Sequence, residues 1–116
     1  LQRLGDYDVG LSYVPKERFD PAPPLKSIEY LASGLTVVAT NTKGNELLIE
    51  QHENGILTAE DPLSFAQGIL LAANSPELRR KFAGSARDSV EQYDWEHLIE
   101  SRLLPVYADV VQGRVP

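Results

Sequence analysis

Three short apolar runs in the first half of the chain predict β-strands. They occupy residues 8–15 (DVGLSYVP), 36–40 (TVVAT) and 56–58 (ILT). The middle run lacks polar alternation, which is typical of a strand buried on both faces in a parallel sheet. The pattern therefore predicts an α/β sheet that helices cover on both faces.

Helical patterns separate these strands. Residues 25–33 place apolar side chains at i, i+3, i+6 and i+7, Pro24 suits the first helical position, and Gly34 suits a left-handed cap. A short helix is expected at residues 45–51, whereas residues 16–24 contain three prolines and are expected to form a loop. The order β, α, β, α, β predicts right-handed crossovers and an open parallel sheet of about three strands.

The second half of the chain is patterned as a series of helices. Asp61 and Ser75 are placed to cap the first two, each with a proline directly after it, and Asp94 to cap the third. The apolar face expected on the first helix consists of Ala66, Ile69, Leu70 and Ala73. The face expected on the second consists of Leu78, Phe82, Ala86 and Val90. Pro105 lies inside the third helix, where it removes a backbone donor and should produce a kink.

Composition and charge exclude several classes of function. The 116 residues fit one small domain, and the absence of cysteine excludes disulfides, thiolate metal sites and cysteine nucleophiles. A net charge of -6 argues against a nucleic-acid partner, which would need a basic surface. Two isolated histidines do not have the spacing of a metal site, and no apolar run has the length of a membrane span. The expected location is the cytoplasm.

The start of the helix at Leu25 is the candidate binding site. In open α/β sheets, ligands bind beyond the carboxyl ends of the strands, and helix starts offer free amides and positive potential to anions. The amides of Leu25, Lys26 and Ser27 precede the first intrahelical bond. The positive charge of Lys26 opposes the helix dipole, at a cost of about 0.3–1 kcal/mol when exposed. A bound phosphate would make this charge favourable instead. The alternative is that Lys26 points to solvent.

Glu29 lies one turn further along the same helix. A carboxylate there can accept two hydrogen bonds from a ribose diol whose phosphates rest on the helix start. Taken alone, a glutamate in a helix is usually a solvated surface residue. The residues around Glu29 decide between these two interpretations.

Residues 23–40 (PPLKSIEYLASGLTVVAT) resemble the PPLK-x-x-EYLA-x-G-x-x-VVAT signature of GT-B glycosyltransferases, most closely retaining family 4. Residues 43–46 (KGNE) are similar to that family's G-x-x-E turn, and residues 53–57 (ENGIL) to its E-N-G-x-L turn. Residues 75–80 (SPELRR) and 93–95 (YDW) are similar to its closing helices. The resemblance extends from about residue 6 to residue 111.

This resemblance implies that the chain binds the nucleotide-sugar donor of an enzyme of carbohydrate biosynthesis. Glu29 would hold the ribose hydroxyls, and the backbone of residues 25–27 would meet the diphosphate with help from Lys26. An earlier glutamate of the family corresponds to Pro21 here, with Asp20 beside it, so the contacts to the donor sugar are left open. The resemblance assigns no catalytic residue, no metal and no cofactor besides the donor substrate.

The resemblance also implies that residues 1–116 form a single domain that is part of a larger enzyme. A complete donor domain of this family is Rossmann-like with six parallel strands, of which this chain would supply the last three. Two parts of such an enzyme would lie outside this chain. One is the set of basic residues that clamp the diphosphate, and the other is the N-terminal acceptor domain. Lys16 and Arg18 are candidate substitutes for that clamp, although exposed loop charges are more often solubilising. The intact enzyme could be cytoplasmic or attached to a membrane surface.

Two alternatives come from other functional classes. Nucleotide-sugar epimerases share the GT-B architecture, although PPLK-x-x-EYLA is not their usual motif. A non-catalytic interaction domain of receiver type would need an acidic cluster after its first strand, whereas Asp8 precedes that strand. A further expectation is self-association, because residues 8–15 would form an exposed edge strand in which residues 9–14 contain no lysine, proline or inward charge, and this strand could pair with a second copy.

Overall fold

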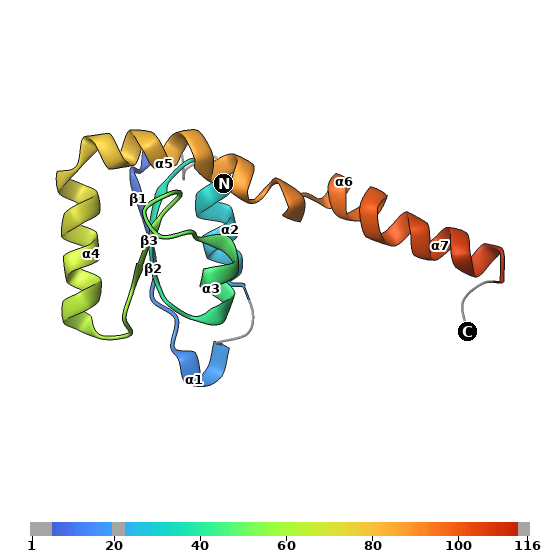
Figure 1. The fold of residues 1–116 in the computed structure, drawn as a ribbon, viewed down its shortest axis with the longest axis horizontal. Coiled ribbons are helices and arrows are strands. Elements are labelled where there is room, and N and C mark those ends of the chain that lie inside the picture. Colours follow the sequence, from blue (N-terminus) through green and yellow to red (C-terminus); the bar gives the residue numbers. More distant parts are fainter. Residues whose placement is uncertain (1–5, 20–22, 114–116) are drawn as a thin grey trace.

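The computed structural model describes residues 6–19 and 23–113 and contains a parallel three-stranded sheet. Its strands are β1 (Val9–Ser12), β2 (Thr36–Thr40) and β3 (Ile56–Thr58), in the spatial order β1-β2-β3 (Figure 1). Gly10 is paired with Val37 in the first ladder, and Ala39 with Leu57 in the second. The α/β fold with a parallel sheet is therefore confirmed.

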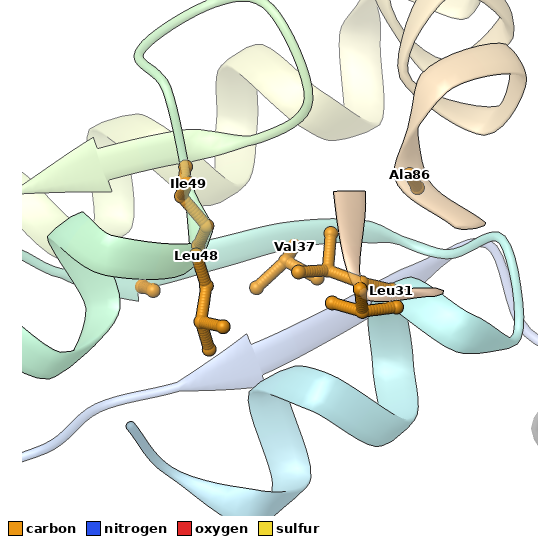
Figure 2. Close-up of a cluster of buried hydrophobic side chains, with 7 residues drawn as sticks. Leu31, Val37, Leu48, Ile49 and Ala86 are labelled. Carbon is orange, nitrogen blue, oxygen red and sulfur yellow. The ribbon is translucent and has the colours of Figure 1, made fainter. Parts of the chain in front are cut away.

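Helices cover both faces of β2, all five residues of which are buried. On one face, α2 (Leu25–Ala32) and α3 (Lys43–Leu48) pack against the sheet, and on the other α4 (Pro62–Asn74) does (Figure 1). The first layer contains Leu31, Val37, Ala39, Leu48, Ile49, Ala86 and Val90, most of which Figure 2 labels. The second contains Val38, Ile56, Phe65, Ala72 and Phe82. Helix α5 (Pro76–Ser89) contributes to both layers and joins them.

Most predicted helix ends are confirmed. Gly34 has a φ of 78° and follows α2 in the left-handed conformation. Asp61 caps α4 by accepting the N–H of Ser64 at 2.8 Å, and Ser75 caps α5 by accepting the N–H of Leu78 at 3.4 Å. Pro24 is the residue before α2 rather than its first helical residue.

Two predictions for the first half need correction. A single helical turn, α1 (Lys16–Phe19), lies where a loop was expected, because one turn is too short to show periodicity. Helix α3 spans Lys43–Leu48 rather than residues 45–51. It begins earlier because Thr42 caps it by accepting the N–H of Asn45 at 3.0 Å, and it ends earlier because the backbone is extended at Ile49.

The face that α4 buries also differs from the expected one. Its buried residues are Phe65, Gly68 and Ala72. A Cβ added to Gly68 would lie 2.7 Å from Thr58 Cγ2 and 3.0 Å from Val38 Cγ1. The glycine therefore lets α4 approach the sheet closely, which rotates the predicted apolar face (Ala66, Ile69, Leu70 and Ala73) partly toward solvent. On α5 the predicted face is confirmed: Phe82 and Ala86 are buried, as is Val90 directly after the helix.

The C-terminal segment leaves the body of the protein as a helical arm (Figure 1). After a 3-10 turn, η2 (Glu91–Tyr93), it consists of α6 (Trp95–Leu98), a π-helical turn, η3 (Ile99–Leu103), and α7 (Leu104–Val111). The π-helical turn ends at Leu103, and Pro105 is the second residue of α7. The helix is therefore irregular just before the proline, which cannot donate a backbone hydrogen bond. None of the helices in the described part of the chain combines the length and the apolar character of a membrane span.

Candidate functional site

The carboxyl ends of β1 and β2 meet the starts of α2 and α3 in a buried polar network. Ser12 ends β1, Ser27 lies in the first turn of α2, and Asn45 lies in the first turn of α3; all three are fully buried. The Ser27 hydroxyl donates to Asn45 Oδ1 at 2.8 Å and lies 2.7 Å from the Ser12 hydroxyl. Because the Ser27 hydroxyl has one proton, Ser12 is the donor in the second bond.

The same network ties the end of β2 to the segment after β1. Asn45 Nδ2 donates to the carbonyl of Thr40 at 2.9 Å. The hydroxyl of Thr40 accepts the N–H of Val14 at 2.9 Å and donates to the carbonyl of Val14 at 2.8 Å. Buried polar groups are costly unless they are hydrogen-bonded, and a satisfied network favours one geometry. These bonds therefore fix the starts of α2 and α3 relative to the strand ends.

Close packing of α2 on β1 adds a second constraint. A Cβ added to Gly10 would lie 2.5 Å from two atoms of the Tyr30 ring. No other amino acid leaves room for the ring at this distance, so Gly10 sets how closely α2 lies to β1. The start of α2 is thus held by the buried network at its first turn and by the packing of Tyr30 against Gly10 further along the helix.

An open cavity of ≈ 600 Å³ lies between the end of β1 and the first turn of α2. It is lined by Tyr13, Val14, Pro15, Pro23, Pro24, Leu25, Lys26 and Glu29. The charged members of this lining are Lys26, which is exposed, and Glu29, which is half-buried. The structure therefore brings together the two side chains that the sequence singles out, at a place where the other walls are largely apolar.

Backbone donors are available at the same place. Within the described residues, the amides of Leu25 and Lys26 have no hydrogen-bond acceptor. The amide of Ser27 differs from the expectation, because it donates to the carbonyl of Pro24 at 3.1 Å. Its side chain is also committed to the buried network. The anion-binding capacity of the helix start therefore rests on Leu25 and Lys26, while Ser27 holds the turn in place.

The other candidate residues are not among the described residues that line this cavity. Lys16 is exposed in α1, and its backbone N–H donates to Glu60 Oε2 at 3.1 Å. Asp20 and the side chain of Arg18 lie outside the described residues. The sequence-based reading also missed Ser12, Thr40 and Asn45. The sequence contains only a weak signal for these residues. Ser12 and Thr40 are polar residues at the ends of apolar strands, and Asn45 lies three residues after the helix cap Thr42.

A family model and two of three similar proteins are described as glycosyltransferases. The family model for "Glycosyl transferases group 1" matches residues 9–75. An uncharacterized glycosyltransferase of Haemophilus influenzae is 37% identical over 79 residues, which are 66% of this chain and 22% of that protein. Spore coat protein SA of Bacillus subtilis is 32% identical over 89 residues, which are 72% of this chain and 23% of that protein.

A phosphatidyl-myo-inositol mannosyltransferase of Mycobacterium tuberculosis is 26% identical over 88 residues, again 72% of this chain and 23% of that protein. The matched part of this chain thus corresponds to less than a quarter of the length of each of these relatives. The family match contains β1, β2, β3 and the start of α2, and so includes the cavity and the buried network.

Proposed function

Because the chain belongs to the glycosyl transferases group 1 family, we propose that it is the donor-binding part of a GT-B glycosyltransferase. The intact enzyme, of the retaining family 4 type, would transfer a sugar from a nucleoside diphosphate sugar to an acceptor hydroxyl. One observation carries the proposal: Lys26 and Glu29 line one cavity together with the open amides at the start of α2.

The arrangement suits the two polar parts of a nucleotide. A diphosphate at the start of α2 would accept from the amides of Leu25 and Lys26, be favoured by the helix dipole, and pair with the Lys26 ammonium. Glu29, one turn further along, would accept hydrogen bonds from the ribose hydroxyls. Ser27 would contribute indirectly by holding this turn against Ser12 and Asn45.

The comparisons support sugar transfer over the alternatives, because the relatives include a glycosyltransferase and a mannosyltransferase. The chain matches less than a quarter of each relative. We therefore propose that residues 1–116 are the C-terminal portion of the donor domain and that another part of the intact enzyme binds the acceptor. The 116-residue chain alone should transfer no sugar, and detectable turnover with any donor and acceptor would contradict this.

We also propose a cytoplasmic enzyme that works at a membrane surface when its acceptor is a lipid.

The donor site can be tested by ¹⁵N NMR titration of the chain with UDP, GDP and ADP. We expect saturable shifts at Leu25, Lys26 and Glu29 with at least one of these nucleotides. Glu29→Ala should weaken binding by about 1.5–3 kcal/mol, the range for a hydrogen bond to a charged group. Free nucleobases should bind poorly to both forms.

Glu100→Ala is the matched control, because Glu100 is an exposed glutamate on the helical arm. It should leave nucleotide affinity unchanged. If Glu29→Ala also left the affinity unchanged, the ribose assignment would be wrong. If none of the three nucleotides shifted the α2 resonances, the donor-site proposal as a whole would fail.

A further inference from the structure

A second cavity, of ≈ 280 Å³, lies at the opposite end of the sheet, where β1 and β2 begin. Its lining includes Tyr7, Asp8, Thr36, Arg79 and Arg80. Thr36 is the first residue of β2 and Thr40 the last, so about 13 Å of strand separates this cavity from the network beside the donor site. The two cavities share no lining residue.

Thr36 brings an unsatisfied hydroxyl to this cavity. The residue is 1% exposed, and its Oγ1 has no hydrogen-bond partner among the described residues. Alternate side chains of a strand share a face, so Thr36 points to the same side as Val38, which packs with Phe82 of α5. A buried hydroxyl without a partner calls for an explanation, and a molecule bound in the adjoining cavity supplies one.

Two consecutive arginines of α5 line the same cavity. Arg79 Nη1 donates to the carbonyls of Ala72 at 2.8 Å and Ala73 at 2.6 Å, which fixes its guanidinium at the end of α4. Arg80 is exposed, and neither arginine forms an ion pair with another described residue. In a protein of net charge -6, two adjacent unpaired guanidinium groups form a local positive site.

Asp8 places an acceptor at the edge of this positive site. Its backbone carbonyl accepts the N–H of Thr36 at 3.0 Å, which holds the residue beside the start of β2. The two guanidinium groups exceed its single carboxylate by one charge. A ligand that matches this arrangement has one anionic group and, next to it, a hydroxyl that can donate to Asp8.

We propose that Thr36, Arg79 and Arg80 form a second anion site, separate from the donor site, that binds a small hydroxylated phosphate monoester. Its phosphate accepts from both guanidinium groups and from the Thr36 hydroxyl, and its hydroxyl donates to Asp8. Guanidinium groups match carboxylate and phosphate oxygens, but donors that converge from a helix and a strand suit a tetrahedral group better than a planar one.

The test is a ¹⁵N NMR titration of the 116-residue chain with inorganic phosphate and with glycerol 3-phosphate, at constant ionic strength. We expect saturable shifts at Gly34, Thr36, Arg79 and Arg80, and tighter binding of glycerol 3-phosphate than of inorganic phosphate. Thr36→Val keeps the shape of the side chain and removes the hydroxyl, and Arg80→Gln changes an exposed residue. Each should weaken binding about tenfold, as expected for loss of a hydrogen bond to a charged group.

Two controls separate this site from general attraction and from the donor site. Arg102→Gln removes an exposed arginine from the helical arm and should leave affinity unchanged. Lys26→Gln should weaken nucleotide binding at α2 but leave the shifts at Thr36 and Arg80 intact. The proposal is overturned if these residues show no saturable shifts across the millimolar range, if Thr36→Val and Arg80→Gln bind as tightly as the parent, or if Lys26→Gln abolishes the shifts. Equal affinity for the two titrants would overturn the role of Asp8.

Discussion

The Ser27 hydroxyl donates to Asn45 Oδ1 across 2.8 Å, and this bond joins the first turns of α2 and α3. Both side chains are fully buried, so water cannot replace either partner. The bond belongs to a chain of donors that runs from Ser12 through Ser27 and Asn45 to the carbonyl of Thr40. The position of the proposed donor site therefore depends on residues that no ligand would touch.

Removing the Asn45 amide should destabilise the protein. Asn45→Ala removes two buried hydrogen bonds, although the Ser27 hydroxyl keeps Ser12 as a partner and the Thr40 carbonyl keeps the N–H of Thr42 at 2.9 Å. The loss should cost about 0.5–1.5 kcal/mol for each bond. Urea denaturation of the variant measures the change in the free energy of unfolding. Asn74→Ala, at the exposed end of α4, is the control and should change it by at most about 0.5 kcal/mol.

The double variant tests whether Ser27 and Asn45 act together. If they do, Ser27→Ala combined with Asn45→Ala should show a coupling energy of about 0.5–3 kcal/mol in a double-mutant cycle. Additive losses would mean that the 2.8 Å contact contributes little to stability.

The approach of α2 to β1 can be tested with a pair of glycine substitutions. Gly10→Ala would place a Cβ 2.5 Å from the Tyr30 ring and should cost about 1–3 kcal/mol, the usual penalty for overpacking a core. At Gly84, in the middle of α5, an added Cβ has no heavy atom within 4 Å. Gly84→Ala should therefore stabilise the helix by about 0.5–1 kcal/mol. Thermal melts of both variants check the opposite signs, and a tolerated Gly10→Ala would contradict the close-packing argument.

The sequence predicted those features that depend on neighbouring residues. Strand β2 was located correctly because each of its residues is apolar or a β-branched threonine, which suits full burial. Asp61 and Ser75 were identified as caps because capping depends on residues within one turn. Lys26 and Glu29 could be paired from spacing alone, since residues three apart lie on one side of a helix.

Features that depend on distant residues could not be predicted in this way. Ser12, Ser27 and Asn45 come from three separate segments, and only the assembled fold shows that their polar groups satisfy one another. The buried face of α4 was misjudged because Gly68 does not count as apolar, although its lack of a side chain determines the packing. The open amide expected at Ser27 failed for a local reason, because Pro24 offers its carbonyl from just before the helix.

Stability should depend on pH through the cap of α4. The hydrogen bond from the Ser64 backbone N–H, with a smaller one from its side chain, lowers the pKa of Asp61 below its usual value. A carboxylate with a lowered pKa stabilises the folded state above its unfolded-state pKa of about 3.9, and this contribution is lost as pH falls through the lower folded-state pKa. Asn is an equally good capping residue without a charge. As pH falls from about 3.9 through the folded-state pKa of Asp61, the melting temperature of Asp61→Asn should therefore fall less than that of the parent.

The control for this pH dependence is Glu100→Gln, which removes an acidic group from the exposed helical arm. It should leave the acidic part of the stability profile parallel to that of the parent. If the melting temperatures of the parent and of Asp61→Asn fell in parallel from neutral pH to below the Asp61 pKa, the lowered pKa would not contribute to stability.

Self-association through β1 is the remaining prediction. Within the described chain β1 is an edge strand. The carbonyl of Asp8 is bonded to Thr36 of β2, and alternate residues of a strand direct their backbone groups to opposite sides. Val9, Leu11 and Tyr13 therefore direct theirs away from β2. The side chains of Leu11 and Tyr13 are also 42% and 39% exposed.

An apolar strand with an open edge pairs readily with another strand, and a two-fold axis would join two copies of β1 in antiparallel fashion. We expect sedimentation at micromolar concentration to show a dimer, which Leu11→Lys should convert to a monomer. Leu104→Lys is the matched control, because Leu104 is 52% exposed on α7 and receives the same charge away from the edge. A parent protein that is monomeric, with a mass unchanged by Leu11→Lys, would rule out edge pairing. A dimer that only Leu104→Lys dissociates would assign the association to the helical arm instead.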